Sequence, residues 1–190
     1  RVGILIDGLP LGYILPVSAA QFIVAPEDEN NNYIIASSIR LLRYLAVVIT
    51  LLLPAIYVAM ANFHQEMIPY KLIRAIVVSK ENVPFNTAAE VLGMLLAFEV
   101  LQEAGLRLPK SIGQTVSIIG SLVVGQSAVE AKIFSPVVVI VVAVAGVAGY
   151  TIPNQDFSAA IRLWRIVMTA SAAMLGLFGM AVALMIMIYH

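Results

Sequence analysis

The stretch Ile166–Tyr189, IVMTASAAMLGLFGMAVALMIMIY, decides the fold class of this chain. It carries no charge, and as a helix it extends about 36 Å, enough to cross a hydrocarbon core of about 30 Å. Three more uncharged stretches of similar length lie at 44–63, 111–129 and 133–153. Backbone groups in lipid need partners within their own segment, so we expect each stretch to be a membrane-spanning helix.

The composition agrees with a membrane protein. Of 190 residues, 61% are hydrophobic and 12% are charged, and the mean hydropathy is +0.97; soluble domains carry about 25% charged residues. The net charge is zero, so no overall field favours nucleic acid. The chain has no cysteine, which excludes disulfides and thiolate catalysis. We predict an all-α integral membrane helical bundle with four to five transmembrane helices.

The first part of the chain has a different character. We read 1–40 as the C-terminal edge of a soluble α/β domain followed by a polar linker, and 41–190 as the helical transmembrane domain. Strands are expected at 2–6 and 12–15, with a turn at 7–10. The linker is PEDENNN, residues 26–32. Because the chain starts with Arg1 rather than Met, we expect a piece of a longer protein.

The segment 88–104 is ambiguous, because it is interfacial, re-entrant or a fifth span. Thr87 and Glu90 form a capping-box pattern at its start. With five spans, Lys and Arg near the membrane divide six to four and the positive-inside rule places the N-terminus inside. With four spans, both ends lie on one side and the same cations divide three to seven. Further on, Ser135 with Pro136 is expected to start the helix of the third span, and Asp156 to cap the last one.

Glu99 and Glu103 lie one turn apart inside the apolar segment 88–104. A carboxylate in such a helix must be paired, protonated or in contact with water. Glu99 is therefore either in a salt bridge with Arg107 or Lys110 or located at the membrane interface, or it is a cation site or a charge at a pore mouth. Within the first span, Pro54 predicts a kink, which is either packing shape or a hinge.

The span 111–129 carries a stripe of small and polar residues. Gln114, Ser117, Ser121, Gly125 and Ala128 follow steps of three and four, so they share one helix face. Such a face is either a close packing surface or the lining of a water-filled pore. Gln126 and Glu130 lie on another face, toward a neighbouring helix or subunit. Glycine pairs at 146/149 and 176/179 are three apart, which differs from the four-residue spacing of helix-dimer motifs.

Catalytic and cofactor motifs are lacking in the sequence. His64 and Glu66 are too few ligands for a zinc site. We find neither a nucleophile elbow nor a phosphate-binding or dinucleotide-binding glycine loop. The sequence therefore predicts neither an enzyme nor a protein with a metal or cofactor.

Several strings, in order along the chain, resemble the A subunit of the GerA-type spore germinant receptors. The first is the loop His64, Gln65, Glu66, Met67, Ile68, Pro69. The others are Asp7-Gly8 with Pro10, Arg40–Arg43, Leu51–Pro54, Glu103–Pro109, Ile112–Gln114, Val124–Gln126, Ala128–Glu130 and Tyr150–Pro153.

The resemblance implies a multi-pass protein in the inner membrane of the bacterial endospore. It implies a homo-oligomer, a pentamer, that forms a ligand-gated cation channel and acts with a transporter-like B subunit and a lipoprotein C subunit. It also favours four spans. An A-like paralogue linked to dipicolinic-acid release belongs to the same family and stays an alternative.

Three hypotheses follow. In the first, Gln114, Ser117, Ser121 and Gly125 line the pore of a channel, Glu99, Glu103 and Glu130 attract cations or bind neighbouring subunits, and Pro54 is the hinge. In the second, the chain is a non-conducting scaffold that couples a nutrient-binding partner to downstream germination machinery. The third is a secondary transporter, disfavoured because the sequence shows no inverted repeat.

Overall fold

The computed structural model describes residues 2–5, 12–15, 18–25, 28, 32–106 and 110–189. Near the N-terminus, strands β1 (Val2–Leu5) and β2 (Gly12–Leu15) pair antiparallel, with Val2 opposite Leu15. A short 3-10 helix, η1 (Ala19–Phe22), follows. The turn expected at 7–10 and most of the expected linker 26–32 lie outside the described residues.

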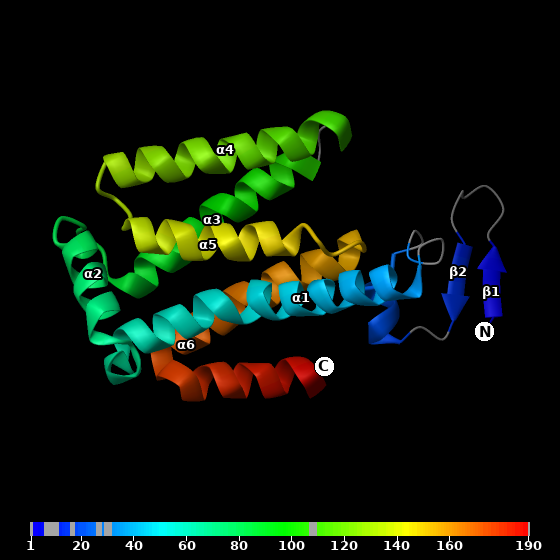
Figure 1. Ribbon diagram of the computed structural model, residues 1–190, viewed down its shortest axis with the longest axis horizontal. Coiled ribbons are helices and arrows are strands. Elements are labelled where there is room, and N and C mark those ends of the chain that lie inside the picture. The colour runs from blue at the N-terminus through cyan, green and yellow to red at the C-terminus, as the bar shows by residue number, and fades with distance from the viewer. Residues whose placement is uncertain are drawn as a thin grey trace.

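The rest of the described chain is helical (Figure 1). Its elements are α1 (Tyr33–Asn62), η3 (Gln65–Met67), α2 (Tyr70–Lys80), α3 (Thr87–Leu106), α4 (Lys110–Glu130), α5 (Pro136–Gly149) and α6 (Gln155–Tyr189). In Figure 1, α1 and α5 run lengthwise beside each other, α4 forms an outer edge, and α2 stands across one end of the bundle. The helix α3, expected at 88–104, packs against α1, α4, α5 and α6.

Two apolar clusters hold the bundle together, and α1 contributes to both. In the first, Leu51, Ala55 and Ala59 of α1 pack against Met168 and Ala172 of α6. In the second, Val58 of α1 packs against α3 and α5 through Val91, Met94, Leu95, Phe98, Val138 and Val142. The helices approach closely where side chains are small: a Cβ added to Gly149 would lie 3.4 Å from Thr50 Cγ2.

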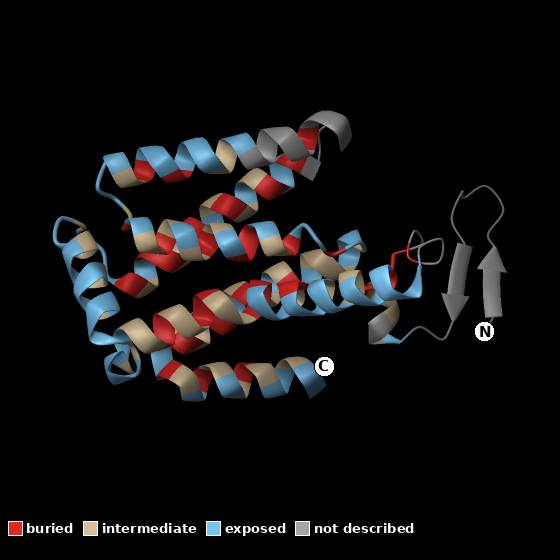
Figure 2. Ribbon diagram, viewed as in Figure 1, coloured by how far each residue is buried: buried red, intermediate tan, exposed pale blue. Residues whose placement is uncertain are grey.

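Figure 2 shows exposed residues on the outer faces of the helices and buried ones between them. Many of the exposed residues are large and apolar, while a few charged side chains are buried. Leu122, Val147 and Phe178 are 68%, 64% and 70% exposed, whereas Glu90 and Arg165 are 0% and 1% exposed. Soluble proteins bury charged side chains very seldom. Among the described residues, two helices, α1 and α6, are long and apolar enough to cross a membrane, and α5 is apolar but shorter.

The expectation of one continuous helix over 166–189 is wrong, because α6 breaks at Gly176. This glycine has φ 64° and ψ −144°, a conformation outside the helical region. A Cβ on Gly179 would overlap the carbonyl oxygen of Ser171, although an unbroken helix would separate the two residues by about 12 Å along its axis. The C-terminal part of α6 therefore folds back alongside the bundle (Figure 1).

The ends of α5 and α6 test the expected caps. Ser135 is the N-cap of α5 and Pro136 occupies its first turn, as expected. Asp156 does not cap α6, because the preceding Asn154 takes that role. The Asn154 side-chain oxygen accepts a hydrogen bond from Phe157 N at 2.9 Å, and its carbonyl accepts one from Ser158 N.

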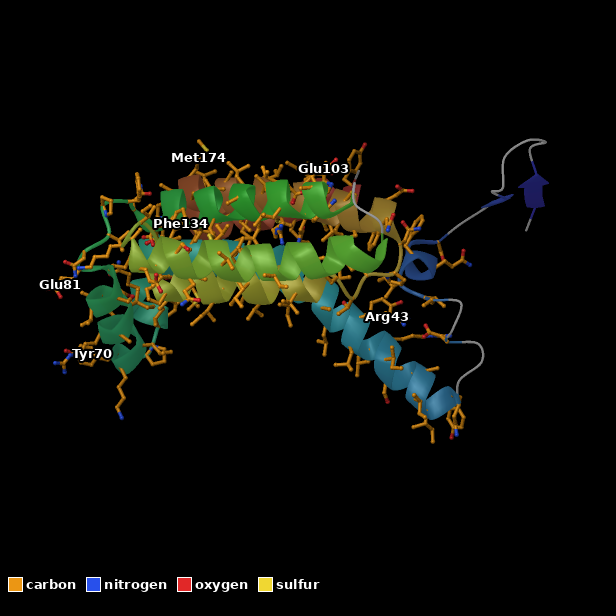
Figure 3. All side chains as sticks on the ribbon, turned by 90° about the horizontal axis from the view of Figure 1, so that it is seen from above. Arg43, Tyr70, Glu81, Glu103, Phe134 and Met174 are labelled. Carbon is orange, nitrogen blue, oxygen red and sulfur yellow. The ribbon has the colours of Figure 1, made fainter. Side chains whose placement is uncertain are left out.

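The segment before α1 is tied to the bundle by Asp28. Its carboxylate, 1% exposed, lies 2.5 Å from Arg43 Nη1 and 3.6 Å from Arg40 Nε. Arg43 also donates to the carbonyl of Ile23 at 3.2 Å. The hydrogen bond from Arg43 is the main reason that the pKa of Asp28 lies below its usual value of 3.8. In Figure 3, Arg43 lies on α1 where this segment meets it.

We predict that Gly176→Ala lowers the unfolding free energy by about 1–3 kcal/mol, since only glycine adopts this backbone conformation without strain. Thermal unfolding in detergent measures the change. Gly93→Ala is the matched control: Gly93 lies inside α3, and an added Cβ would meet Phe134 at an ordinary 3.5 Å. Equal stability of the two variants would contradict the strained turn.

We predict that Asp28→Asn loosens the segment before α1 at neutral pH. A group with a lowered folded pKa stabilises the fold above its unfolded value and loses that contribution as pH falls. The difference between wild type and variant should therefore be present at pH 7 and shrink below about pH 3.8. Hydrogen exchange of residues 18–25 at several pH values measures it, and a difference that grows toward acid would refute the assignment.

Candidate functional site

The helix α3 carries one buried carboxylate, Glu90, and one half-buried carboxylate, Glu99, and each organises a cluster of polar contacts. We call the first the Glu90 cluster, which contains Glu90, Lys80, Thr87 and Ser135. Glu90 Oε1 lies 3.0 Å from Lys80 Nζ, and Glu90 Oε2 accepts a hydrogen bond from Ser135 N at 2.8 Å. Lys80 also donates to Thr87 Oγ1 at 2.5 Å. One carboxylate thus joins α2, α3 and the start of α5.

The capping role expected for Thr87 and Glu90 is wrong. Asn86 caps α3 instead, because its side-chain oxygen accepts from Ala89 N at 2.8 Å and its carbonyl from Glu90 N at 3.0 Å. The Glu90 carboxylate can therefore accept the hydrogen bond from the backbone N–H of Ser135, which is buried and needs an acceptor. A carboxylate beside the first turn of α5 also interacts favourably with that helix dipole.

The second group, the Glu99 cluster, contains Glu99, Arg162, Arg165 and Gln102. Glu99 Oε1 lies 3.3 Å from Arg162 Nε, and Oε2 lies 3.5 Å from Arg165 Nη2. Arg162 also donates to Gln102 Oε1 at 3.3 Å. The first turns of α6 thus meet the second half of α3. The expected partners of Glu99 were Arg107, which lies outside the described residues, and Lys110, of whose side chain nothing is described.

The Glu99 cluster joins one carboxylate to two guanidinium groups, and Arg165 is fully buried. Because an unpaired buried charge is strongly unfavourable, Glu99 is needed by both arginines. Because the Glu99 carboxylate is already paired with these two cations, it attracts further cations less strongly than an unpaired carboxylate would. The sequence analysis considered only Arg107 and Lys110 as partners of Glu99 and so missed this pairing.

The α4 stripe is described only in part, because nothing is described of the side chains of Gln114 and Ser117. Ser121 is half-buried. Gly125 is buried where α4 meets its neighbours: an added Cβ would lie 3.0 Å from Val139 of α5 and 3.6 Å from Met94 of α3. At this position the small residue serves close helix packing.

The two remaining acidic candidates lie on the surface. Glu130 is exposed at the end of α4 and accepts a hydrogen bond from Gln126 at 3.1 Å. Glu103 is exposed on α3, at the opposite end of the bundle from Tyr70 and Glu81 of the α2 region (Figure 3). The structure therefore does not bring Glu99, Glu103 and Glu130 together as one group.

The loop of His64, Gln65, Glu66 and Pro69 connects α1 to α2. His64 and the preceding Phe63 lie against the break in α6, since a Cβ on Gly176 would be 3.2 Å from each. Gln65 donates to the carbonyl of Ala61 at 2.9 Å. Pro54, the expected hinge, is buried within α1. The loop therefore packs against the point where α6 reverses direction. No sequence motif predicted this contact.

These features define a helical bundle with an apolar exterior and with charged pairs between its helices. In the part of the chain that the structure describes, two of these helices are long and apolar enough to cross a membrane. The chain belongs to the GerA family: the profile of the Bacillus/Clostridium GerA spore germination protein matches residues 1–190.

Proteins of Bacillus subtilis (strain 168) are similar to all of this chain. Spore germination protein KA is 43% identical, and the chain covers 35% of its length. Spore germination protein B1 and the uncharacterized membrane protein YfkQ are each 40% identical, and the chain covers 39% and 37% of their lengths. The chain thus spans little more than a third of these relatives. No solved structure matches it.

We predict that Lys80→Met lowers the unfolding free energy by about 3 kcal/mol or more, because it leaves the buried Glu90 carboxylate without its cation. In a Glu90→Gln background the same substitution should cost much less. A double-mutant cycle by thermal unfolding measures the coupling. Glu130→Gln is the exposed control and should change stability by less than about 0.5 kcal/mol. Additive effects at 80 and 90 would contradict the pairing.

Proposed function

We propose that this chain is the membrane-embedded part of a germinant-receptor A subunit that acts in nutrient-triggered spore germination. Membership of the GerA family is the observation that carries the proposal. The apolar exterior of the bundle and the likeness to a named membrane protein support the membrane location. The proposed site is the inner membrane of the endospore, with 41–190 as the transmembrane domain and 1–40 as the edge of a soluble domain.

The proposed membrane topology has four to five crossings, made by α1, α4, α5 and α6, with α3 as the fifth. The central packing of α3 against four other helices supports counting it among the crossings rather than at the interface. The buried Glu90 and Arg165 of its two ion-pair clusters also need a position inside a bundle. The break at Gly176 leaves the first part of α6 as the crossing segment and 177–189, about 20 Å of helix, as a returning one.

In the proposed mechanism, copies of the A subunit assemble, as a pentamer, into a ligand-gated cation channel together with a transporter-like B subunit and a lipoprotein C subunit. The outer position of α4 supports its use between copies. Its exposed residues include Leu122 and Val123 beside Gln126 and Glu130. Gln114, Ser117 and Ser121 are the proposed pore lining, and Glu103 and Glu130 the proposed charges at its ends.

A second candidate function is a non-conducting scaffold that couples a nutrient-binding partner to downstream machinery. The burial of Gly125 and Ala128 within the chain favours it, because part of the α4 stripe is then a packing face. The gating bend proposed at Pro54 is part of the channel hypothesis and not of the scaffold hypothesis. The two functions differ in whether water reaches the stripe.

We expect single cysteines at Gln114, Ser117 and Ser121 to react with a membrane-impermeant thiol reagent at least tenfold faster than one at Val123. Val123 is 55% exposed on the outside of the bundle, where lipid would shield it. The native chain contains no cysteine, so its background is clean. Labelling is measured on the full-length protein in assembled complexes, before and after nutrient addition. Uniform protection in both states would exclude the pore and leave the scaffold.

A further inference from the structure

A cavity of about 360 Å³ opens at the α2 end of the bundle. The end of α1, the η3 loop, α2 and the start of α3 form its walls. This is the end where Tyr70 and Glu81 lie in Figure 3. The volume falls within the range of small-molecule sites, about 300–1,000 Å³. Neither charge cluster on α3 fills the cavity, but Lys80 and Thr87 of the Glu90 cluster line it.

The walls of the cavity have two characters. Ile73 and Ile76 of α2 supply an apolar side, while the amides of Asn62 and Asn86 supply hydrogen-bonding groups. Lys80 is the single charged side chain among the described lining residues. The walls therefore suit a molecule with one apolar part and one polar part.

The charged group that lines the cavity is the ammonium of Lys80, whose ion-pair partner Glu90 lies outside the lining. A lysine ammonium has three N–H donors. Lys80 donates a hydrogen bond to Thr87 Oγ1 and forms an ion pair with Glu90. The ammonium can therefore still donate to a ligand. Glu90 is fully buried behind Lys80 and does not line the cavity. The N-terminus of α3, at Thr87, adds the partial positive charge of its helix dipole.

We propose that this cavity binds a small molecule with an anionic head, a carboxylate or phosphate, and a short apolar tail. The head contacts Lys80 and the amides, and the tail lies against Ile73 and Ile76. Two sources have this chemistry: a soluble organic acid and an anionic lipid headgroup. The inference goes beyond the proposed function and does not depend on it, because binding is measured without germination or ion flux.

Occupancy would act on the bundle through Lys80. An anionic head that attracts the ammonium competes directly with Glu90, which also holds the start of α5 through Ser135 N. Binding therefore alters the contact by which α2, α3 and α5 are joined. The cavity is thus placed to pass a chemical signal from one end of the bundle to its interior.

The test uses the full-length protein in phosphatidylcholine nanodiscs, with 4-methylpentanoate as the soluble probe and 4-methylpentanamide as its neutral match. Calorimetry measures binding. Ile73→Trp fills the cavity without changing charge. Lys80→Met is combined with Glu90→Gln so that no buried carboxylate is left alone. Lys71→Met, which removes a lysine of α2 outside the cavity lining, is the control.

We expect the acid to bind at least tenfold more tightly than the amide. Ile73→Trp and the double variant should each weaken acid binding at least tenfold, while Lys71→Met leaves it unchanged. A lipid source gives a different positive result: phosphatidylglycerol nanodiscs raise the melting temperature, the double variant abolishes that rise, and Lys71→Met keeps it. Equal binding of acid and amide, indifference to Ile73→Trp, or no response to either source would overturn the proposal.

Discussion

The pairing of Glu90 and Glu99 with cations from other helices is the interaction on which the arrangement of this bundle depends. Both carboxylates belong to α3, a largely apolar helix that contacts four others. Apolar packing is non-directional and would tolerate several rotations of such a helix. Ion pairs to Lys80 on one side of α3 and to Arg162 and Arg165 on the other select one rotation of the helix about its axis. The charges therefore specify orientation in a bundle that apolar contacts alone would leave ambiguous.

Hydropathy alone located most of the helices, because long uncharged runs have few other stable structures in lipid. The starts of α5 and α3 show when a prediction from neighbouring residues succeeds and when it fails. Ser135 and Pro136 are adjacent and occupy the N-cap and the first turn of their own helix, so the prediction was correct. Glu90 satisfied the same kind of local rule, yet its partner is Ser135, a residue 45 positions away. A local rule cannot distinguish a side chain used nearby from one used at long range.

The break in α6 was also beyond local reasoning. Gly176 and Gly179 lie in a run whose composition predicts an uninterrupted helix, and glycine is frequent in membrane helices. What requires the glycine at 176 is its backbone conformation together with Phe63 and His64 packed against it. Those residues come from a loop more than a hundred positions earlier. Gly125 of α4 was beyond local reasoning for the same reason. Its packing role depends on Val139 and Met94, which lie beside it on other helices.

The long sequence separation within the Glu99 cluster has a consequence for how the protein is made. Glu99 leaves the ribosome about 60 residues before Arg162, an interval on the order of 3–12 s at 5–20 residues per second. During that time its carboxylate has neither arginine of α6 as a partner. Lys80, by contrast, is synthesised before Glu90 and is ready when it appears. The chain can therefore assemble its α2–α3 corner early, while Glu99 gains its arginine partners only after α6 has been translated.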